Sequence, residues 1–234
     1  AWILKQAGHD LIGVTMKLFD NGDVGVEGES SCCSLDDVED ARAVARQLGF
    51  PFYVFNFSRQ FHHQVMDRFA CAYERGETPN PCIDCNRYLK FGALLQRAKE
   101  LDRDYVATGH YVRLSYDRGS GRWLLHKALH PEKDQSYVLY NLTQDQLSHS
   151  LFPLGGLSKD EIRAMAAQQG LINAKKHESQ DICFVPDGDY AAFIRRHTGK
   201  TYPHGPFLDQ EGHVLGEHTG IVGYTVGQRR GLGV

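Results

Sequence analysis

The sequence contains no apolar run near the roughly 20 residues that a membrane-spanning helix requires. It has no internal repeat and no low-complexity tract, so we do not expect a repeat protein or a disordered chain. The residues after Ala1 show no basic segment followed by an apolar stretch and a small-residue cleavage site, the pattern of a secretion signal. We therefore expect a globular protein of the cytoplasm with no membrane partner.

Basic residues are missing from residues 18–41, which carry eight acidic ones. The formal net charge of the whole chain is −3, which does not by itself indicate nucleic-acid binding. Basic residues gather later, as the pairs Arg87/Lys90, Lys127/Lys133, Lys175/Lys176, Arg195/Arg196 and Arg229/Arg230. A basic face on an acidic protein is compatible with this distribution, but the sequence alone does not locate one.

Short apolar runs alternate with helical patterns through most of the 234 residues. Runs at 11–17, 52–57 and 105–108 predict strands, the first of them buried, and 35–48, 61–76 and 86–101 show apolar residues at helical spacing. Such alternation predicts an α/β fold, a parallel sheet with helices on both faces. Functional groups in these folds gather at the carboxyl ends of strands, where Met16 and Gly109 fall.

The composition changes after Pro186. Residues 182–185 predict one more short strand, and beyond them glycine, histidine and turn residues dominate, with strand-like pieces such as 221–226. We place a domain boundary there, with a catalytic domain over 1–186 and part of a small central domain over 187–234. A hairpin is expected over 111–129, and a capping box at 158–161 predicts the start of a helix.

Three of the six cysteines lie in motifs that suggest chemistry. Cys82 and Cys85 form a C-x-x-C between Pro81 and Asn86, and Cys183 lies in a second short motif. A helix beginning near Asn86 would put both thiols at its N-terminus, where thiolate is favoured. A reactive site shared with Cys183, a zinc site, a thioredoxin-like pair and inert buried thiols are the alternatives.

The remaining candidates are weaker when taken singly. Cys32 and Cys33 in an expected loop, and Cys71 on a helix, are interpreted as non-catalytic, with Cys71 a packing residue. The pair His62-His63 is interpreted as solvated surface. Gly109 would let a ligand approach the backbone closely, with His110 as a contact or a turn residue. The segment Lys133-Asp134-Gln135-Ser136 either caps a helix or presents polar groups to RNA.

Taken together, the ordered motifs resemble the tRNA-specific 2-thiouridylases of the MnmA/TrmU family. Each motif is weak alone, but together they run through the whole chain in the family's order. The matching segments are Gly13-Val14-Thr15-Met16, Cys32-Cys33-Ser34, Thr78-Pro79-Asn80-Pro81, Cys85-Asn86, Lys90-Phe91, Ala107-Thr108-Gly109-His110-Tyr111, Lys133-Asp134-Gln135-Ser136-Tyr137, Ser179-Gln180-Asp181-Ile182-Cys183-Phe184 and Gly227-Gln228-Arg229-Arg230-Gly231-Leu232-Gly233.

The resemblance implies a Rossmann-like fold of the adenine nucleotide alpha hydrolase type and the activity of a tRNA-uridine 2-sulfurtransferase. It makes residues 1–186 an ATP-pyrophosphatase-type catalytic domain and residues 187–234 part of a central tRNA-contacting domain. Such an enzyme uses ATP and Mg²⁺ to adenylate the C2 oxygen of the wobble uridine in tRNA, and a cysteine persulfide then supplies sulfur. It implies a sulfur-donor protein of a cysteine desulfurase relay as a partner. It also implies a phosphate-binding loop before Ala1 and a β-barrel after Val234, so we expect the 234-residue chain alone to be inactive.

The resemblance also implies roles for individual residues. Cys183 would carry the persulfide, and Cys85 would be the nucleophile that releases its sulfur, leaving a Cys85–Cys183 disulfide. The contacts it implies are Met16 and Gly109 with ATP, Asn80, Pro81 and Cys82 with the target base, and His110, Lys133, Asp134 and Gln135 with tRNA.

Cys82 departs from the family pattern, because many members have aspartate there as a proposed acid/base. As a thiol, Cys82 is either a substitute acid/base or, with Cys85 and Cys183, a ligand of a [4Fe–4S] cluster. A non-catalytic zinc-stabilised or RNA-binding module is the rival of another class. Amide-forming ligases with related ATP-binding domains need no trio of cysteines, which argues against them.

Overall fold

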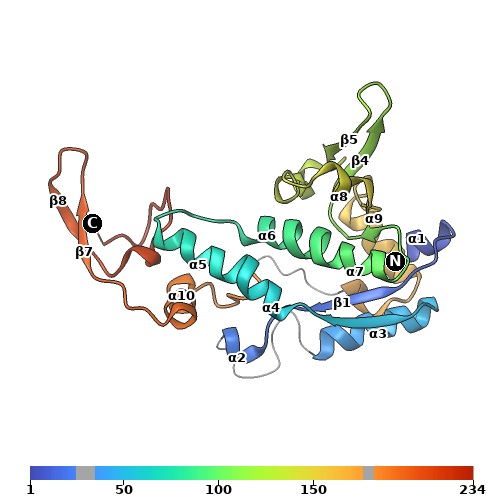
Figure 1. The fold of residues 1–234 in the computed structure, drawn as a ribbon, viewed down its shortest axis with the longest axis horizontal. Coiled ribbons are helices and arrows are strands. Elements are labelled where there is room, and N and C mark those ends of the chain that lie inside the picture. The colour runs from blue at the N-terminus through green and yellow to red at the C-terminus, as the bar shows by residue number, and fades with distance from the viewer. Residues whose placement is uncertain (25–34, 176–181, 234) are drawn as a thin grey trace.

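The computed structural model describes residues 1–24, 35–175 and 182–233 (Figure 1). The elements in chain order are α1 (Trp2–Gln6), β1 (Gly13–Lys17), α2 (Asn21–Val24), α3 (Leu35–Leu48), β2 (Phe52–Asn56), α4 (Ser58–Phe61), η1 (His62–Met66), α5 (Asp67–Glu74), α6 (Pro81–Asp84), η2 (Cys85–Ala93), α7 (Leu94–Glu100), β3 (Val106–Ala107), β4 (Val112–Asp117), β5 (Arg122–Lys127), η3 (Pro131–Lys133), η4 (Ser136–Val138), α8 (Gln144–Ser148), β6 (Ser150–Leu151), α9 (Lys159–Gln168), η5 (Ile172–Lys175), α10 (Tyr190–Thr198), β7 (Gly205–Leu208), β8 (Val214–His218) and η6 (Ile221–Gly223). None of the helices in these ranges is long and apolar enough to cross a membrane.

The first two strands form a parallel pair, as the sequence predicts. β1 and β2 pair in register from Gly13 opposite Phe52 to Lys17 opposite Asn56. The crossover between them includes α3, which packs on both strands. Gly49 ends α3 with a φ of 70°, a conformation that glycine adopts without steric cost. Helix α3 lies on one side of this pair and α5, α6 and α7 on the other (Figure 1).

A second parallel pair completes the α/β part. The predicted strand 105–108 is reduced to β3, which pairs with β6, a strand that sequence reasoning missed. In the part of the chain that the structure describes, β1 and β3 share no hydrogen bonds. A cleft of about 350 Å³ lies between them, lined by residues that include Val14, Val106 and Leu151. The parallel pairing is confirmed, but the strands form two separate pairs.

Two long helical stretches connect these strands. Residues 58–74 and 81–100 are each continuous, and each contains π-type turns, at η1 and η2. The second stretch starts at Pro81, so the predicted start near Asn86 is wrong. The reason is local: Asn80 caps the helix by accepting a hydrogen bond from the Cys82 N–H at 3.0 Å, and Pro81 suits the first helical position.

Antiparallel hairpins project from this body. The predicted hairpin is confirmed as β4 and β5, and the Ser158 capping box begins α9 as expected. β7 and β8 form a second hairpin that extends from the opposite end of the molecule (Figure 1). The strand-like piece expected at 221–226 is a short 3₁₀ turn, η6, so that expectation is wrong.

Two hydrophobic cores support the fold. The aromatic core consists of Phe19, Val24, Phe57, Phe61, Val65, Met66, Phe69, Ala70, Tyr73, Cys85, Leu89, Phe184, Val185, Phe193, Ile194 and Val222. The aliphatic core consists of Phe91, Leu95, Ala98, Val106, Val112, Val138, Leu139, Leu142 and Leu147.

The predicted strand at 182–185 is wrong, because this segment forms turns. Phe184 and Val185 are each 1% exposed within the aromatic core, and the Val185 N–H donates to the Ile182 carbonyl at 2.8 Å. The segment is therefore anchored by side-chain burial instead of strand pairing. Phe193 and Val222 belong to the same core, so residues on both sides of the predicted boundary near 186 pack together.

Candidate active site

The C-x-x-C motif lies at the start of the helical stretch 81–100. Cys82 is exposed in its first turn, whereas Cys85, three residues later, is buried in the aromatic core. Residues three apart on a helix are neighbours on its surface, so the two thiols lie on adjacent positions of one face. The motif therefore presents one thiol to solvent and one to the core.

Cys183 and Met16 reach the same core from other parts of the chain. Both are partly buried and pack against the aromatic core, which also contains Cys85. Met16 lies near the carboxyl end of β1, and Cys183 lies in the turn before Phe184. The fold thus gathers around one core the two cysteines predicted to be catalytic and one residue predicted to contact ATP.

The other cysteines lie elsewhere. Cys71 is exposed on α5, where the Arg75 Nη1 donates to its sulfur at 2.9 Å, so its predicted packing role is wrong. Cys32, Cys33 and the polar flank at 179–181 lie outside the described residues.

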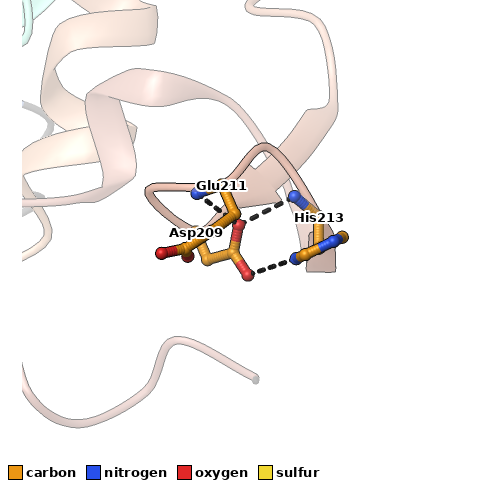
Figure 2. Close-up of side chains that lie close together, drawn as sticks. All are labelled: Asp209, Glu211 and His213. Carbon is orange, nitrogen blue, oxygen red and sulfur yellow. Dashed lines mark hydrogen bonds and ion pairs between the residues drawn. The ribbon is translucent and has the colours of Figure 1, made fainter.

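Only one group of three potential ligands in the described ranges is close enough to surround a single ion. It is Asp209, Glu211 and His213 at the β7–β8 turn (Figure 2), and the three predicted cysteines do not form such a group. Asp209 accepts hydrogen bonds from the Glu211 and His213 N–H groups at 3.0 and 2.8 Å, and lies 2.9 Å from the His213 Nδ1. These contacts close the turn. The structure therefore offers no support for a single-ion zinc site at the cysteines.

An ion pair that sequence reasoning missed braces the C-x-x-C motif. The Arg68 Nε donates to the Asp84 carboxylate, inside the motif, at 2.9 Å. The guanidinium groups of Arg68 and Arg87 lie 5.3 and 5.2 Å from the centre of the Tyr88 ring. The Asp84 hydrogen bond raises the pKa of Arg68 above its ordinary value. The motif is thus joined to α5 by charge.

Asn86, next to Cys85, has a structural role that its motif did not indicate. It is 1% exposed, and its Nδ2 donates to the Val138 carbonyl at 3.2 Å. Its Oδ1 has no hydrogen-bond partner among the described residues. This bond fixes the turn η4 beside the helix that carries the cysteines. In the sequence, the only sign of this role was an asparagine directly after Cys85.

The histidine predicted to contact tRNA is largely enclosed. The His110 Nδ1 lies 2.7 Å from the Thr108 Oγ1, and its ring lies 6.2 and 6.3 Å from the rings of Phe91 and Phe152. Burial, with a smaller effect from the nearby Lys90 charge, lowers the pKa of His110 to about 3. The imidazole is therefore neutral near pH 7, so any RNA contact would be a hydrogen bond and not an ion pair.

Gly109 is exposed at the end of the β3 segment. A Cβ added there would lie 3.5 Å from the Leu154 Cδ1, an ordinary contact, and its φ is not in the left-handed region. The protein itself therefore does not require glycine at this position. A glycine that leaves space for a bound ligand is consistent with the structure.

Two side chains of the segment predicted to contact tRNA form hydrogen bonds within the protein. Asp134 accepts hydrogen bonds from the Ser136 hydroxyl at 2.7 Å and the Ala128 N–H at 2.8 Å, and the Gln135 Oε1 accepts from the Tyr111 N–H at 3.0 Å. Burial alone would raise the pKa of Asp134, but these hydrogen bonds hold it below its ordinary value. Asp134 and Gln135 thus anchor the start of η4 to the residues beside β5 and β4, and η4 has no side-chain cap at Gln135.

In the histidine pair, His63 is exposed as expected, whereas His62 is partly buried. The His62 Nε2 lies 3.1 Å from the Asp23 carboxylate, and its ring lies 5.8 Å from that of His197 on α10. His63 and His197 both contact Asp67, at 3.1 and 2.7 Å. The interpretation of His62 as solvated surface is therefore wrong, because it takes part in a contact between elements.

These features define a Rossmann-type α/β protein in which Cys85, Cys183 and Met16 of the first strand share one core. The family described as the tRNA methyl transferase HUP domain matches residues 1–187, and the PRC-barrel domain of the same name matches 191–234. A protein of Clostridioides difficile named tRNA-specific 2-thiouridylase MnmA is 50% identical over all of this chain and 64% of its own length. One of the same name from Clostridium acetobutylicum is 51% identical over all of this chain and 65% of its own.

The chain therefore belongs to the MnmA family of tRNA-specific 2-thiouridylases, as the motifs indicated. It spans slightly less than two thirds of the length of these relatives. The family description mentions methyl transfer, whereas both relatives are named for thiolation. The cysteines at positions 85 and 183 are consistent with the second name.

Proposed function

We propose that the protein catalyses the ATP-dependent 2-thiolation of the wobble uridine in tRNA. The observation that carries this proposal is the shared packing of Cys85, Cys183 and Met16 on the aromatic core. Cys85 belongs to this core, and Cys183 and Met16 pack against it from distant parts of the chain, which supports a site for sulfur transfer to a nucleotide-activated base. The names of the relatives support the same reaction.

In the first step, the C2 oxygen of the uridine attacks the α-phosphorus of ATP, and pyrophosphate, with its Mg²⁺, leaves. The adenylated base then carries AMP as a good leaving group on C2. Met16 and Gly109 would contact ATP, since both lie near the ends of parallel strands, where such folds bind ligands. The exposed Gly109 backbone leaves room for the nucleotide.

In the second step, a sulfur-donor protein of a cysteine desulfurase relay has loaded Cys183 as a persulfide. The terminal sulfur bonds to C2 and AMP leaves, while the Cys85 thiolate attacks the Cys183 sulfur and breaks its bond to the transferred sulfur. The electron pair of that bond goes with the transferred sulfur. The products are 2-thiouridine, AMP and a Cys85–Cys183 disulfide, which a dithiol reductant reopens.

RNA would be held around the start of the helix, where Asn80 and Cys82 are exposed and Pro81 is buried. Asn80, Pro81 and Cys82 would contact the target base after it leaves its stack, and Cys82 would serve as the acid/base. His110 and the segment Lys133, Asp134 and Gln135 would contact tRNA. The turn η4 supports this arrangement because Asn86 ties it to the cysteine helix.

The test replaces single cysteines and measures 2-thiouridine by mass spectrometry of digested tRNA, with the protein at the length of its relatives. Cys85→Ser and Cys183→Ser should each abolish product, and only Cys183→Ser should abolish persulfide loading. Cys71→Ser is the matched control, an exposed thiol on a neighbouring helix, and should leave both unchanged. Product from Cys183→Ser at the unmodified rate would contradict the proposal.

A second candidate route has Cys82, Cys85 and Cys183 as ligands of a [4Fe–4S] cluster. The observation in its favour is that Cys82 and Cys85 occupy adjacent positions on one helix face, with Cys183 on the same core as Cys85. Anaerobic purification followed by iron and sulfide analysis tests it. Cys82→Asp separates the routes, since an acid/base role tolerates the change and a cluster ligand does not. A colourless, fully active protein would exclude the cluster.

A further inference from the structure

The segment 227–233 matches the family motif but has no part in the reaction described above. It carries Arg229 and Arg230, which are both exposed. With the residues that the structure describes, neither guanidinium forms an ion pair or a side-chain hydrogen bond. Arg229 and Arg230 are therefore two adjacent cations without an ion-pair partner among the described residues, on a segment that matches a family motif. This arrangement indicates a site for an anionic ligand.

The segment is held in a compact turn. The Gln228 Oε1 accepts from the Thr225 N–H at 3.1 Å, and the Gln228 Nε2 donates to the Arg230 carbonyl at 2.9 Å. Gly227 and Gly231 flank the arginines with φ values of 82° and 71°, a region that glycine enters without strain. The backbone of the turn is therefore determined without using either arginine side chain.

A hydrogen bond joins this turn to the segment predicted to bind the target base. The Val226 N–H donates to the Thr78 Oγ1 at 2.9 Å, and Thr78 is two residues before Asn80. Figure 1 shows the C-terminal segment passing the end of α5, where the chain turns toward α6. Since an extended chain covers about 3.5 Å per residue, Arg229 lies within about 25 Å of Asn80. That distance is a few nucleotides of RNA backbone.

Two other cations at this end of α5 are paired with carboxylates. Arg75 forms an ion pair with Glu77 at 2.8 Å, and Lys200 forms one with Glu74 at 2.8 Å. Arg229 and Arg230 differ from them in having no carboxylate partner among the described residues. At this end of α5, Arg229 and Arg230 therefore supply positive charge that no described carboxylate neutralises.

We propose that Arg229 and Arg230 bind backbone phosphates of the tRNA next to the target base. The inference rests on the proposed function and adds a contact surface to it. A guanidinium forms paired hydrogen bonds with phosphate oxygens, and such contacts set the register of the RNA without reading its sequence. The Thr78 bond then sets the spacing between the phosphate contacts and the base-binding segment.

The test measures the affinity of the protein for an anticodon stem-loop RNA at several salt concentrations. Arg229→Ala/Arg230→Ala should weaken binding about tenfold per arginine at low salt. The slope of log affinity against log salt should become shallower by about 1.4, or about 0.7 per lost phosphate contact. Arg229→Lys/Arg230→Lys keeps both charges and should retain most of that slope.

Arg118→Ala/Arg122→Ala is the matched control, since it removes two exposed arginines from the β4–β5 hairpin, and it should leave the slope unchanged. Thr78→Val should weaken binding without changing the slope, because it removes the tether and no charge. If the unmodified protein binds RNA but the Arg229/Arg230 variant keeps its affinity and slope, the inference is wrong. If the unmodified protein binds no RNA, the proposed function itself fails.

Discussion

The aromatic and aliphatic cores pack against one helical stretch, residues 81–100, yet they are built differently. Cys85 and Leu89 belong to the aromatic core, and Phe91 and Leu95 belong to the aliphatic one. The aromatic core draws on residues from Phe19 to Val222, whereas the aliphatic core uses only residues 91–147. Cys85 and Cys183, the cysteines predicted to transfer sulfur, both lie at the aromatic core, whose residues come from more distant parts of the chain.

The position of Cys183 depends on the packing of the aromatic core. Cys183 is positioned by the burial of Phe184, whose ring packs edge-on against Phe61 and Phe69 with centroids 5.5 and 5.3 Å away. No strand pairing supports this segment in the described residues. We therefore expect damage to the aromatic core to alter thiol chemistry, and equal damage to the aliphatic core to alter stability alone.

The largest expected effect is that of Phe184→Ala. Removing this fully buried ring should lower the free energy of unfolding by about 3–5 kcal/mol, through lost burial and the cavity left behind. It should also change the alkylation rate of Cys183, because the ring anchors that turn. Urea unfolding and mass spectrometry after iodoacetamide treatment measure the two effects.

Leu139→Ala is the matched change in the aliphatic core, where Leu139 is 0% exposed. It should cost about 2–5 kcal/mol, with no change in Cys183 alkylation under native conditions. Equal alkylation changes in the two variants would remove the proposed distinction between the cores.

A smaller effect on stability is expected from alanine substitution of two glycines near the aliphatic core, and it should differ between them. A Cβ added at Gly155 would lie 1.8 Å from the Val112 carbonyl oxygen, so the backbone must move, and Gly155→Ala should cost about 3 kcal/mol. Gly109→Ala should change stability by less than about 0.5 kcal/mol but weaken ATP binding. Thermal unfolding and equilibrium binding of ATP provide the measurements. Unchanged ATP affinity in Gly109→Ala would argue against its proposed contact.

The smallest effect concerns pH. Burial alone would raise the pKa of Asp67, but hydrogen bonds with His197 and His63 hold it below its ordinary value. A depressed carboxyl pKa adds stability above the unfolded value of about 3.9, and that stability is lost as pH falls through the folded pKa. Asp67→Asn should therefore lower the unfolding free energy at pH 7 by at most about 1 kcal/mol, since Asp67 is half exposed.

Asp134→Asn is the counterpart beside the aliphatic core, where hydrogen bonds also lower the pKa of the carboxyl group. Each variant should show a weaker loss of stability below about pH 4 than the unmodified protein. Urea titrations at pH 7 and pH 3 measure this loss. A steeper acid loss in either variant would contradict the assigned direction of its pKa shift.

Local patterns predicted the parts of the fold that local forces control. The helix ending at Gly49, the β4–β5 hairpin and the Ser158 capping box each depend on neighbours within a few residues, and each was found. The helix start at Pro81 was missed, although Asn80 and Pro81 are strong starting signals. The two failed strands, 182–185 and 221–226, are apolar segments whose conformation depends on distant partners.

For the site, the order and identity of its motifs were determined by the sequence alone: the C-x-x-C, the cysteine at position 183, and the family to which they belong. Tertiary structure decided which residues meet. It joined Cys85, Cys183 and Met16 on one core, separated exposed Cys82 from buried Cys85, and attached the Arg229 turn to Thr78. The physical reason is that such contacts arise from burial and hydrogen bonding between segments up to 167 residues apart, which no local pattern encodes.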